Sequence, residues 1–484
     1  MPPTGTALQR LKDARIARQQ AGLTGQRQHF AASSDADNEA YMQHFEADFS
    51  SLSTAPPGHL SAAATAPSAA PAAARHAGTR KHDMQDTAAA NSRAGVLVQL
   101  SDRPLLCSAA NWGSNEVIIG SSDHASYVVD AAAGKKRRTL YSKTTGHTEW
   151  VTSVCCLPGG RVLSGGMDGR LWLWPAGGSA GTEVSAAHSA PVSKVACLTP
   201  AAARIAAAGG SSSSRSNVGV RAARAAAAAA AEPVLAVSCS YDKTVKVWDV
   251  SGSRAKQQAV LQGHTGPVLE MAVHPAGTCI ATGDRKGGLM CWDLDTGSSS
   301  WGVAAAHQGH ITALAWSAAA ANTPEQHLGC SSSSCFVISG GQDIVVRVWD
   351  GRTGSCSAEQ TVHADKKGKG AAGNIVTGLG SSGNLVVTAG ADMTLRVLDA
   401  AQSYKPIHTV QLTDFPYSLT AAASDLVLCG CGDGSVHVVD VEAGAVLYAL
   451  GAGRAAVRAM EVSPGTERLV CAGDDGCVVC YEFQ

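Results

Sequence analysis

One phrase of fourteen residues, VISGGQDIVVRVWD at 337–350, constrains the fold of this chain more than any other feature, because seven variants of it occur elsewhere in the sequence. The other copies occupy 117–130, 162–175, 237–249, 280–293, 387–399, 428–440 and 469–482. A phrase that returns at a near-fixed period is one structural unit repeated. Such a chain is better suited to holding partners together than to transforming a substrate.

Each copy has the pattern of a strand, a tight turn and a second strand. The turn carries an aspartate in seven copies and a lysine in the eighth, at Asp123, Asp168, Asp242, Lys286, Asp343, Asp392, Asp433 and Asp475. An apolar or aromatic residue follows six positions later, at Val129, Trp174, Trp248, Trp292, Trp349, Leu398, Val439 and Tyr481. A lone hairpin is unstable in water. The units must therefore pack on one another, and a closed ring of small sheets lets each of them do so.

Four copies follow a histidine, at His147, His188, His264 and His310. With these histidines and the Trp-Asp endings, residues 95–484 resemble the WD40 β-propeller family, whose repeats span about 40–45 residues. In that family a histidine, a serine or threonine, an aspartate and a tryptophan form a hydrogen-bonded tetrad within one blade. The resemblance implies three complete tetrads here: His147, Ser164, Asp168 and Trp174; His188, Ser238, Asp242 and Trp248; and His310, Ser339, Asp343 and Trp349.

The remaining copies depart from the tetrad pattern. The copy with His264, Thr282 and Trp292 has Lys286 where the acid belongs, and the sequence leaves open whether Asp284 replaces it. The copies ending at Asp130, Asp399, Asp440 and Glu482 lack the tryptophan. We expect apolar packing to hold those blades together.

The spacing of the copies favours eight blades, with seven as the alternative. Two intervals between turn residues are inflated, and they contain low-complexity insertions at about 201–233 and 317–335. Without the insertions, eight units have about 43 residues each, whereas seven would need about 49, which is longer than the usual repeat. The family more often has seven.

The two ends of the repeat region suggest how the ring closes. The last copy ends on a third strand at 478–483, so its blade lacks an outer strand. The run GVLVQL at 95–100 has strand character and precedes the first copy. We predict that this run supplies the missing fourth strand.

Composition excludes several classes of function. The chain has 38 Lys and Arg against 39 Asp and Glu, a balance that argues against a nucleic-acid-binding surface. It contains no apolar run of about 18 residues, so no membrane span is expected. Among its 15 cysteines, Cys429 and Cys471 stand where other copies have serine or threonine, which favours reduced core thiols in a cytoplasmic or nuclear protein. The pairs Cys429/Cys431 and Cys477/Cys480 are assigned to the core, so neither a metal nor a cofactor is expected.

Residues 1–94 differ from the repeats. Most of this segment is rich in Ala, Ser and Pro, a composition typical of disorder. Residues 6–20 could form a basic helix, and an Arg-rich start also occurs in organellar transit peptides. The segment 35–49, DADNEAYMQHFEADF, is acidic with interleaved aromatic residues. It suits a partner-binding tail better, and we favour that interpretation.

One motif in the fifth copy points to a specific partner. Residues 337–352 end in Trp-Asp-Gly-Arg and resemble the box by which many WD40 proteins dock on the damaged-DNA-binding adaptor of cullin-4 ubiquitin ligases. In that family the arginine equivalent to Arg352 carries docking, and the acids equivalent to Asp343 and Asp350 support it. The basic run at 135–138, which we expect to be a loop between two strands, is better read as solvated than as an import or phosphate-contacting patch.

The sequence therefore predicts a non-catalytic scaffold that binds other proteins, as a monomer within a larger complex. A substrate receptor of a cullin-4-type ligase is the second hypothesis. An enzymatic propeller with a site in its central channel is a distant third, because the recurring aspartates and histidines are accounted for by the turns and tetrads.

Overall fold

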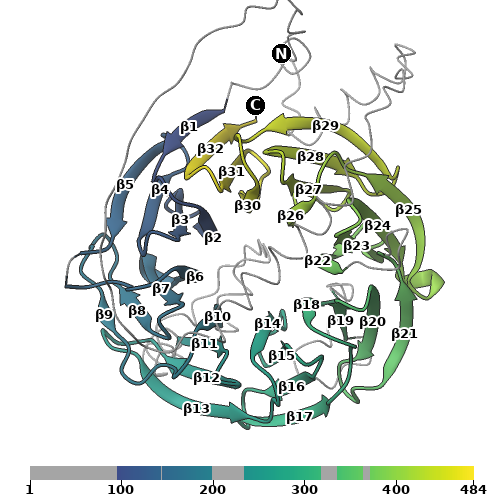
Figure 1. Ribbon diagram of the computed structural model, residues 1–484, viewed down its shortest axis with the longest axis horizontal. Helices are drawn as coiled ribbons and strands as arrows, with labels where there is room; N and C mark the ends of the chain where they lie inside the picture. Colours follow the sequence, from purple (N-terminus) through teal and green to yellow (C-terminus); the bar gives the residue numbers. More distant parts are fainter. Residues whose placement is uncertain (1–94, 143, 199–233, 318–334, 364–370, 484) are drawn as a thin grey trace, which may run out of the picture. The chain divides into compact units, whose positions relative to one another are not determined.

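A computed structural model describes residues 95–142, 144–198, 234–317, 335–363 and 371–483. Over these residues the chain forms eight four-stranded antiparallel sheets, arranged as the blades of a ring (Figure 1). The predicted β-propeller with eight blades is confirmed. The tail at 1–94 and the insertions, at 201–233 and 318–334, lie outside the described residues.

The first four blades carry the following strands, from the channel outward. Blade 1 consists of β2 (Leu105–Asn111), β3 (Glu116–Ser121), β4 (Ser126–Asp130) and β5 (Lys135–Leu140); blade 2 of β6 (Val151–Leu157), β7 (Arg161–Gly166), β8 (Leu171–Trp174) and β9 (Thr182–Glu183); blade 3 of β10 (Val192–Leu198), β11 (Leu235–Ser240), β12 (Thr244–Asp249) and β13 (Lys256–Gln262); and blade 4 of β14 (Val268–Val273), β15 (Cys279–Asp284), β16 (Leu289–Asp293) and β17 (Ser298–Val303).

The other four blades follow the same order, except that the outermost strand of the last is β1, the first strand of the described residues. Blade 5 consists of β18 (Ile311–Trp316), β19 (Phe336–Gly341), β20 (Val345–Asp350) and β21 (Cys356–Thr361); blade 6 of β22 (Ala372–Leu379), β23 (Leu385–Gly390), β24 (Thr394–Asp399) and β25 (Lys405–Gln411); blade 7 of β26 (Pro416–Ala421), β27 (Leu426–Cys431), β28 (Ser435–Asp440) and β29 (Ala445–Gly451); and blade 8 of β30 (Val457–Val462), β31 (Arg468–Gly473), β32 (Cys477–Glu482) and β1 (Val96–Gln99).

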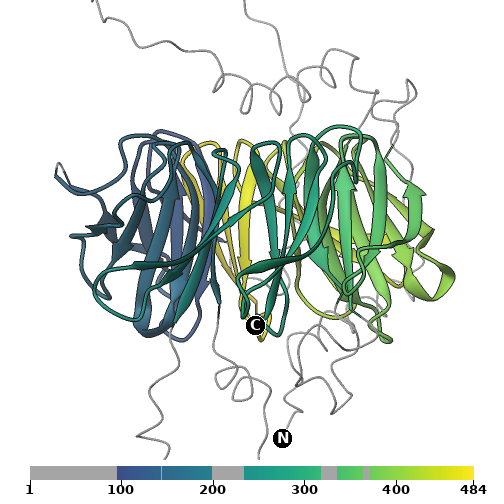
Figure 2. The ribbon, with the colours of Figure 1, turned by 90° about the horizontal axis from the view of Figure 1, so that it is seen from below.

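The hydrophobic core is divided into layers between neighbouring blades. One cluster, for example, packs Ile118 and Val128 of blade 1 against Val154, Trp172 and Trp174 of blade 2. Seen from the side, the strands run between the two faces of the ring (Figure 2). Side chains that alternate along a strand therefore point toward the two neighbouring blades, and each blade needs both neighbours to bury its apolar surface.

Hydrogen bonds also join the innermost strands of adjacent blades. Thr152 Oγ1 donates to the carbonyl oxygen of Val192 in the next blade over 2.6 Å. Ser418 Oγ makes the same kind of bond to Val457 O over 2.7 Å. These bonds satisfy backbone groups at the channel wall and fix the spacing of the blades.

The ring closes where the beginning and the end of the repeat region meet. β1 pairs with β32 in antiparallel register, with Val96 opposite Cys480 and Gln99 opposite Cys477. The prediction that residues 95–100 supply the fourth strand of the last blade is thus confirmed. Just after β1, the Ser101 hydroxyl donates to the Asp123 carboxylate of blade 1, so the same segment also ties blade 8 to blade 1.

Candidate functional site

Blade 2 brings together the four side chains of its predicted tetrad. His147 Nδ1 lies 3.0 Å from Asp168 Oδ1, and its Nε2 lies 2.8 Å from Ser164 Oγ. Trp174 donates its indole N–H to the same Ser164 oxygen over 2.9 Å. Burial alone would raise the pKa of Asp168, but hydrogen bonding and the charge of His147 hold that pKa below its ordinary value.

Blade 3 repeats this arrangement with near-identical geometry. His188 lies 2.8 Å from Asp242 and 2.7 Å from Ser238, and the Trp248 indole N–H donates to Ser238 over 2.8 Å. Burial opposes ionisation of Asp242, yet hydrogen bonds from His188 and Thr244 lower its pKa well below the ordinary value. The carboxylate is therefore held ionised inside its own blade and presents no free base to a substrate.

In blade 5 the predicted histidine was wrong. His307, not His310, contacts Asp343 over 2.8 Å and Ser339 over 2.7 Å, while Trp349 donates to Ser339 over 2.8 Å. In blades 2 to 5 the tetrad histidine stands four residues before the first strand of its blade, as His307 does relative to Ile311. The Gly-His dipeptide at 309–310 resembles the family pattern, but His310 directly precedes β18, and its Nε2 accepts a hydrogen bond from Arg285.

In blade 4, Asp284 takes the role of the missing acid. Its Oδ2 lies 3.0 Å from His264 Nδ1, and His264 Nε2 lies 2.7 Å from Thr282 Oγ1. Trp292 donates to the same threonine oxygen over 2.7 Å. Asp284 is the last residue of β15 rather than a turn residue, so one acid two positions early completes the tetrad that Lys286 interrupts in the sequence.

The sequence patterns missed a tetrad-like cluster in blade 6. His363 lies 2.9 Å from Asp392 and 2.8 Å from Thr388, with Leu398 in the tryptophan position. The histidine follows valine instead of glycine or alanine, and the stretch 364–370, outside the described residues, separates it from β22. A search for a buried threonine and a turn aspartate with an upstream histidine at any distance would have found it.

The aspartate of the Trp-Asp ending has a structural role in blade after blade. Asp350 Oδ1 accepts hydrogen bonds from the backbone N–H groups of Arg352 and Thr353, at 2.8 and 2.9 Å. These two bonds hold the pKa of Asp350 below its ordinary value. Equivalent turns are capped in the same way by Asp130, Asp249, Asp293 and Asp399. The acid of this motif is thus explained by the turn alone.

Arg352 lies exposed on a turn that is held from several sides. Besides the Asp350 cap, the N–H of Gly351 donates to Cys335 O over 2.8 Å. Trp301, from the outer strand of blade 4, donates its indole N–H to Gly351 O over 2.8 Å. The turn presents the guanidinium on a fixed backbone, which limits the entropy that binding through it would cost.

The structure does not bring Asp343 near Arg352. Asp343 precedes β20 and Arg352 follows it, and a six-residue strand spans about 20 Å at roughly 3.3 Å per residue. The two side chains therefore belong to opposite faces of the ring. The Asp343 carboxylate is also engaged by His307 and by Arg347, which lies 2.7 Å away. Of the three predicted docking residues, only Asp350 and Arg352 share one surface.

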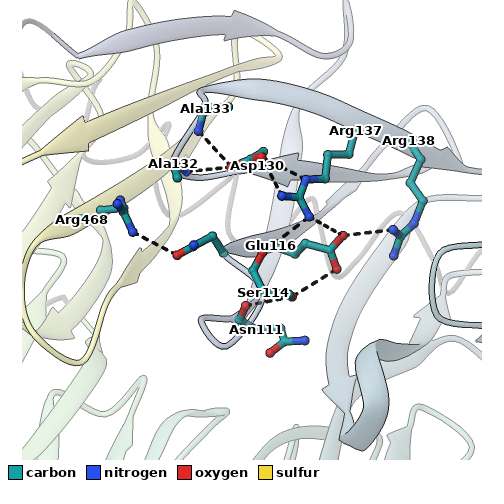
Figure 3. A network of polar contacts seen from close by, with 10 residues as sticks. Asn111, Ser114, Glu116, Asp130, Ala132, Ala133, Arg137, Arg138 and Arg468 are labelled. Atoms are coloured by element: carbon teal, nitrogen blue, oxygen red, sulfur yellow. Dashed lines mark hydrogen bonds and ion pairs between the residues drawn. The ribbon is translucent and has the colours of Figure 1, made fainter.

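The basic run at 135–138 forms strand β5, not the loop predicted between strands. Charged residues on an outer strand discourage pairing with other chains, and this explains why the strand carries no apolar alternation. Figure 3 shows Arg137 and Arg138 converging on Glu116, each over 3.1 Å, and Arg137 also reaches Asp130 over 2.7 Å. Both guanidinium groups are thereby neutralised within blade 1.

Among the described residues, no group of three or more His, Cys, Asp or Glu side chains could hold a metal ion. Cys429, Cys431, Cys477 and Cys480 are buried and free of disulfide bonds. No helix within the described ranges is long and apolar enough to cross a membrane.

Eight four-stranded blades, most of them braced by a histidine, a hydroxyl and an aspartate, define a repeat-built β-propeller. The family model of the WD domain, G-beta repeat, matches residues 135–175, 226–249 and 255–293. The matched residues are thus WD40 repeats, and they lie within a ring of eight blades. Two of these matches, 135–175 and 255–293, start at the outer strand of one blade and end with the third strand of the next, so the sequence repeat is offset from the structural blade.

Several curated relatives with similar sequences are named nuclear distribution proteins. The chain is 28% identical to the nuclear distribution protein PAC1 of Yarrowia lipolytica over 42% of this chain and 40% of the relative. It is 28% identical to PAC1 of Arthroderma otae over 51% and 54%, and 30% identical to PAC1-2 of Uncinocarpus reesii over 42% and 41%. The match thus spans about half of each relative or less.

A solved structure shares the fold. The crystal structure of the computationally designed Ika8 protein superposes with a TM-score of 0.57 at 20% identity, covering 81% of this chain and all of that protein. At this identity the likeness concerns the architecture alone.

Proposed function

We propose that the chain is a non-catalytic scaffold that gathers partner proteins on the surface of a rigid ring. The observation that supports this proposal is that the recurring polar residues contact one another inside the blades. In blades 2 to 6 the histidine and the aspartate hydrogen-bond each other inside their own blade. The repeats therefore build a stable frame, and binding is left to the connections and outer strands, where propellers differ from one another.

The partners of such a scaffold are best sought in the cytoplasm or nucleus. The curated relatives are named for nuclear distribution, and this process is the first in which we would look for them. Affinity purification of the tagged full chain with mass spectrometry tests the proposal. We expect stable protein partners at near-stoichiometric amounts. Purified protein that hydrolyses ester or phosphate substrates, and recovers no partner, would overturn it in favour of an enzymatic propeller.

A second candidate function is that of a substrate receptor docking on a cullin-4 ligase adaptor through Arg352. Two observations favour it: Arg352 is exposed, and its turn is braced by Asp350 and Trp301. Arginine supplies a permanent charge and several donors in a planar group, which suits it to anchor an interface. The matching positions in other blades are Ala132, Gly177, Ser251, Asp295, Ala401 and Glu442.

Charge reversal at the turn tests this second function. Arg352→Asp in the full chain should reduce co-purification of the adaptor at least about tenfold, as loss of a central charged anchor does at other interfaces. Arg254→Asp provides the matched control, because it changes an exposed arginine near the corresponding turn of blade 3. Adaptor binding that survives Arg352→Asp, or that falls equally with the control, removes this route.

A further inference from the structure

The closing blade carries an unusual amount of exposed apolar surface. Val96 and Leu97 of β1 are 49% and 63% exposed and are two of the five large hydrophobic side chains that stand exposed in the described residues. Because successive residues of a strand face opposite sides of the sheet, the side chains of Val96 and Leu97 have different neighbours. Val96 packs beside Gly134 of blade 1, whereas Leu97 faces blade 7.

Leu97 lines a groove between the outer part of blade 8 and the chain that leaves β29 of blade 7. Val479 and Tyr481 of β32 form its floor beside Leu97, and the groove has a volume of about 670 Å³. This volume lies within the range of ligand-binding clefts in proteins, about 300–1,000 Å³. In Figure 1, β1 and β29 flank β32 at this place.

The groove is open because glycines stand on the blade 7 side. Gly451 and Gly453 line it and contribute no side chains. A Cβ atom placed on Gly451 would meet nothing within 4 Å, and the backbone of Gly451 does not have the positive φ that would demand glycine. A side chain at Gly451 would therefore begin in open space, with no steric clash at its Cβ and no backbone penalty.

Arg454 and Asp475 both line one end of the groove. Arg454 is exposed, and within the described residues its guanidinium forms no ion pair or hydrogen bond. The neighbouring Asp475 is engaged instead by backbone groups, since it accepts from the N–H of Arg454 over 3.1 Å and of Cys477 over 3.0 Å. A ligand carboxylate could thus bind Arg454 without displacing an existing partner.

We propose that this groove binds an extended segment of a partner protein, with a bulky apolar side chain on the Leu97, Val479 and Tyr481 floor and a carboxylate on Arg454. The apolar contact removes an exposed leucine from water, and the charged contact sets the direction of the segment. An acidic apolar peptide matches both features, whereas a basic one would bring a like charge to Arg454. The inference rests on the proposed scaffold function and names one of its binding surfaces.

An array of immobilised pentapeptides, probed with the full chain, tests the proposal. Each peptide carries one leucine or phenylalanine and one aspartate, and a matched peptide carries lysine in place of the aspartate. We expect the acidic set to bind at least tenfold more strongly than the lysine set. Equal binding of the two sets, or preference for the lysine set, would overturn the proposal.

Three variants locate the binding. Gly451→Trp should abolish acidic-peptide binding by filling the groove, and Arg454→Glu should exchange the preference from the acidic to the lysine set. Arg254→Glu, an exposed arginine on another blade, should change neither. Melting temperatures equal to wild type establish that the ring is intact. If the Gly451→Trp variant still binds the acidic peptides, the binding site lies elsewhere and the proposed groove site is refuted. If the peptides fail while the full chain still captures partner proteins, the scaffold function stands and the groove alone is refuted.

Discussion

Blades 2 to 5 and the three blades around the closure solve the same packing problem with different chemistry. In blades 2 to 5 a buried tryptophan is hydrogen-bonded to a serine or threonine that also contacts the histidine. Blades 7, 8 and 1 have Val439, Tyr481 and Val129 at the tryptophan position. Cys471 replaces the hydroxyl residue in blade 8, and Ile119 replaces it in blade 1.

The closure side compensates through packing and through its own local contacts. Thirteen buried residues form one cluster between blades 8 and 1, including Leu100, Leu105 and Val478. In blade 1 the Tyr127 hydroxyl donates to Asp123 over 2.6 Å, and Ser101 donates to the same carboxylate. A polar tetrad is therefore one way to brace a blade, and a closed ring does not need it in every blade.

Removing the closure strand should cause the largest effect. Deleting residues 95–101 exposes an edge of β32 and removes Leu100, whose burial alone is worth about 2–5 kcal/mol. We expect a loss of about 5 kcal/mol or more in unfolding free energy and lower solubility. Thermal and urea unfolding of the deletion variant measure this, and an unchanged melting temperature would show that the ring does not depend on β1.

Truncation of the side chain at the tryptophan position should lower the unfolding free energy more in blades 2 to 5 than in the blades around the closure. Trp248→Ala in blade 3 should cost about 3–5 kcal/mol, because it empties a fully buried site and leaves the Ser238 hydroxyl one partner short. Val439→Ala, at the same position of blade 7, should cost roughly 1.5–3 kcal/mol at most. Urea midpoints of the two variants test the difference. Equal losses would mean that the tryptophan tetrad adds nothing beyond apolar burial.

The smallest effect should come from the pH dependence of one tetrad acid. Burial would raise the pKa of Asp343, but hydrogen bonds from His307 and Arg347 lower it below the ordinary value of about 3.9. Such a group stabilises the folded state above its unfolded pKa, and the contribution is lost as the pH falls through its folded pKa. Asp343→Asn should therefore be less stable than wild type at pH 7, and the gap should narrow below about pH 4. Urea unfolding at several pH values would contradict this if the gap stays constant.

The fold could be predicted because each repeat is a local unit whose pattern survives in the sequence. The spacing of the copies led to eight blades, and the unpaired third strand at 478–483 led to the closure strand. The exact members of the polar clusters were harder. A dipeptide pattern selected His310, whereas in blades 2 to 5 the histidine that reaches the acid stands four residues before the first strand. The same pattern passed over His363 entirely.

The surface features could not be predicted from the repeat. Three features depend on where a residue falls relative to a strand end. They are the replacement of the acid at Lys286 by Asp284, the strand rather than loop at residues 135–138, and the separation of Asp343 from Arg352. A shift of one or two positions changes the answer, and sequence patterns do not locate strand ends that closely. The groove at Leu97 could not be predicted from the sequence for a further reason. Two of the residues that line it, Gly451 and Gly453, lie more than 350 residues away along the chain.

The pairing of β1 with β32 also determines how the molecule responds to mechanical force. Val96 lies opposite Cys480, so the two ends of the described propeller leave the sheet at the same place. A pull applied to both ends loads the four residue pairs of this ladder one after another, as in opening a zipper, rather than all at once in shear. The protein should thus resist heat as a complete ring and yet open at low tension when it is tethered by its termini.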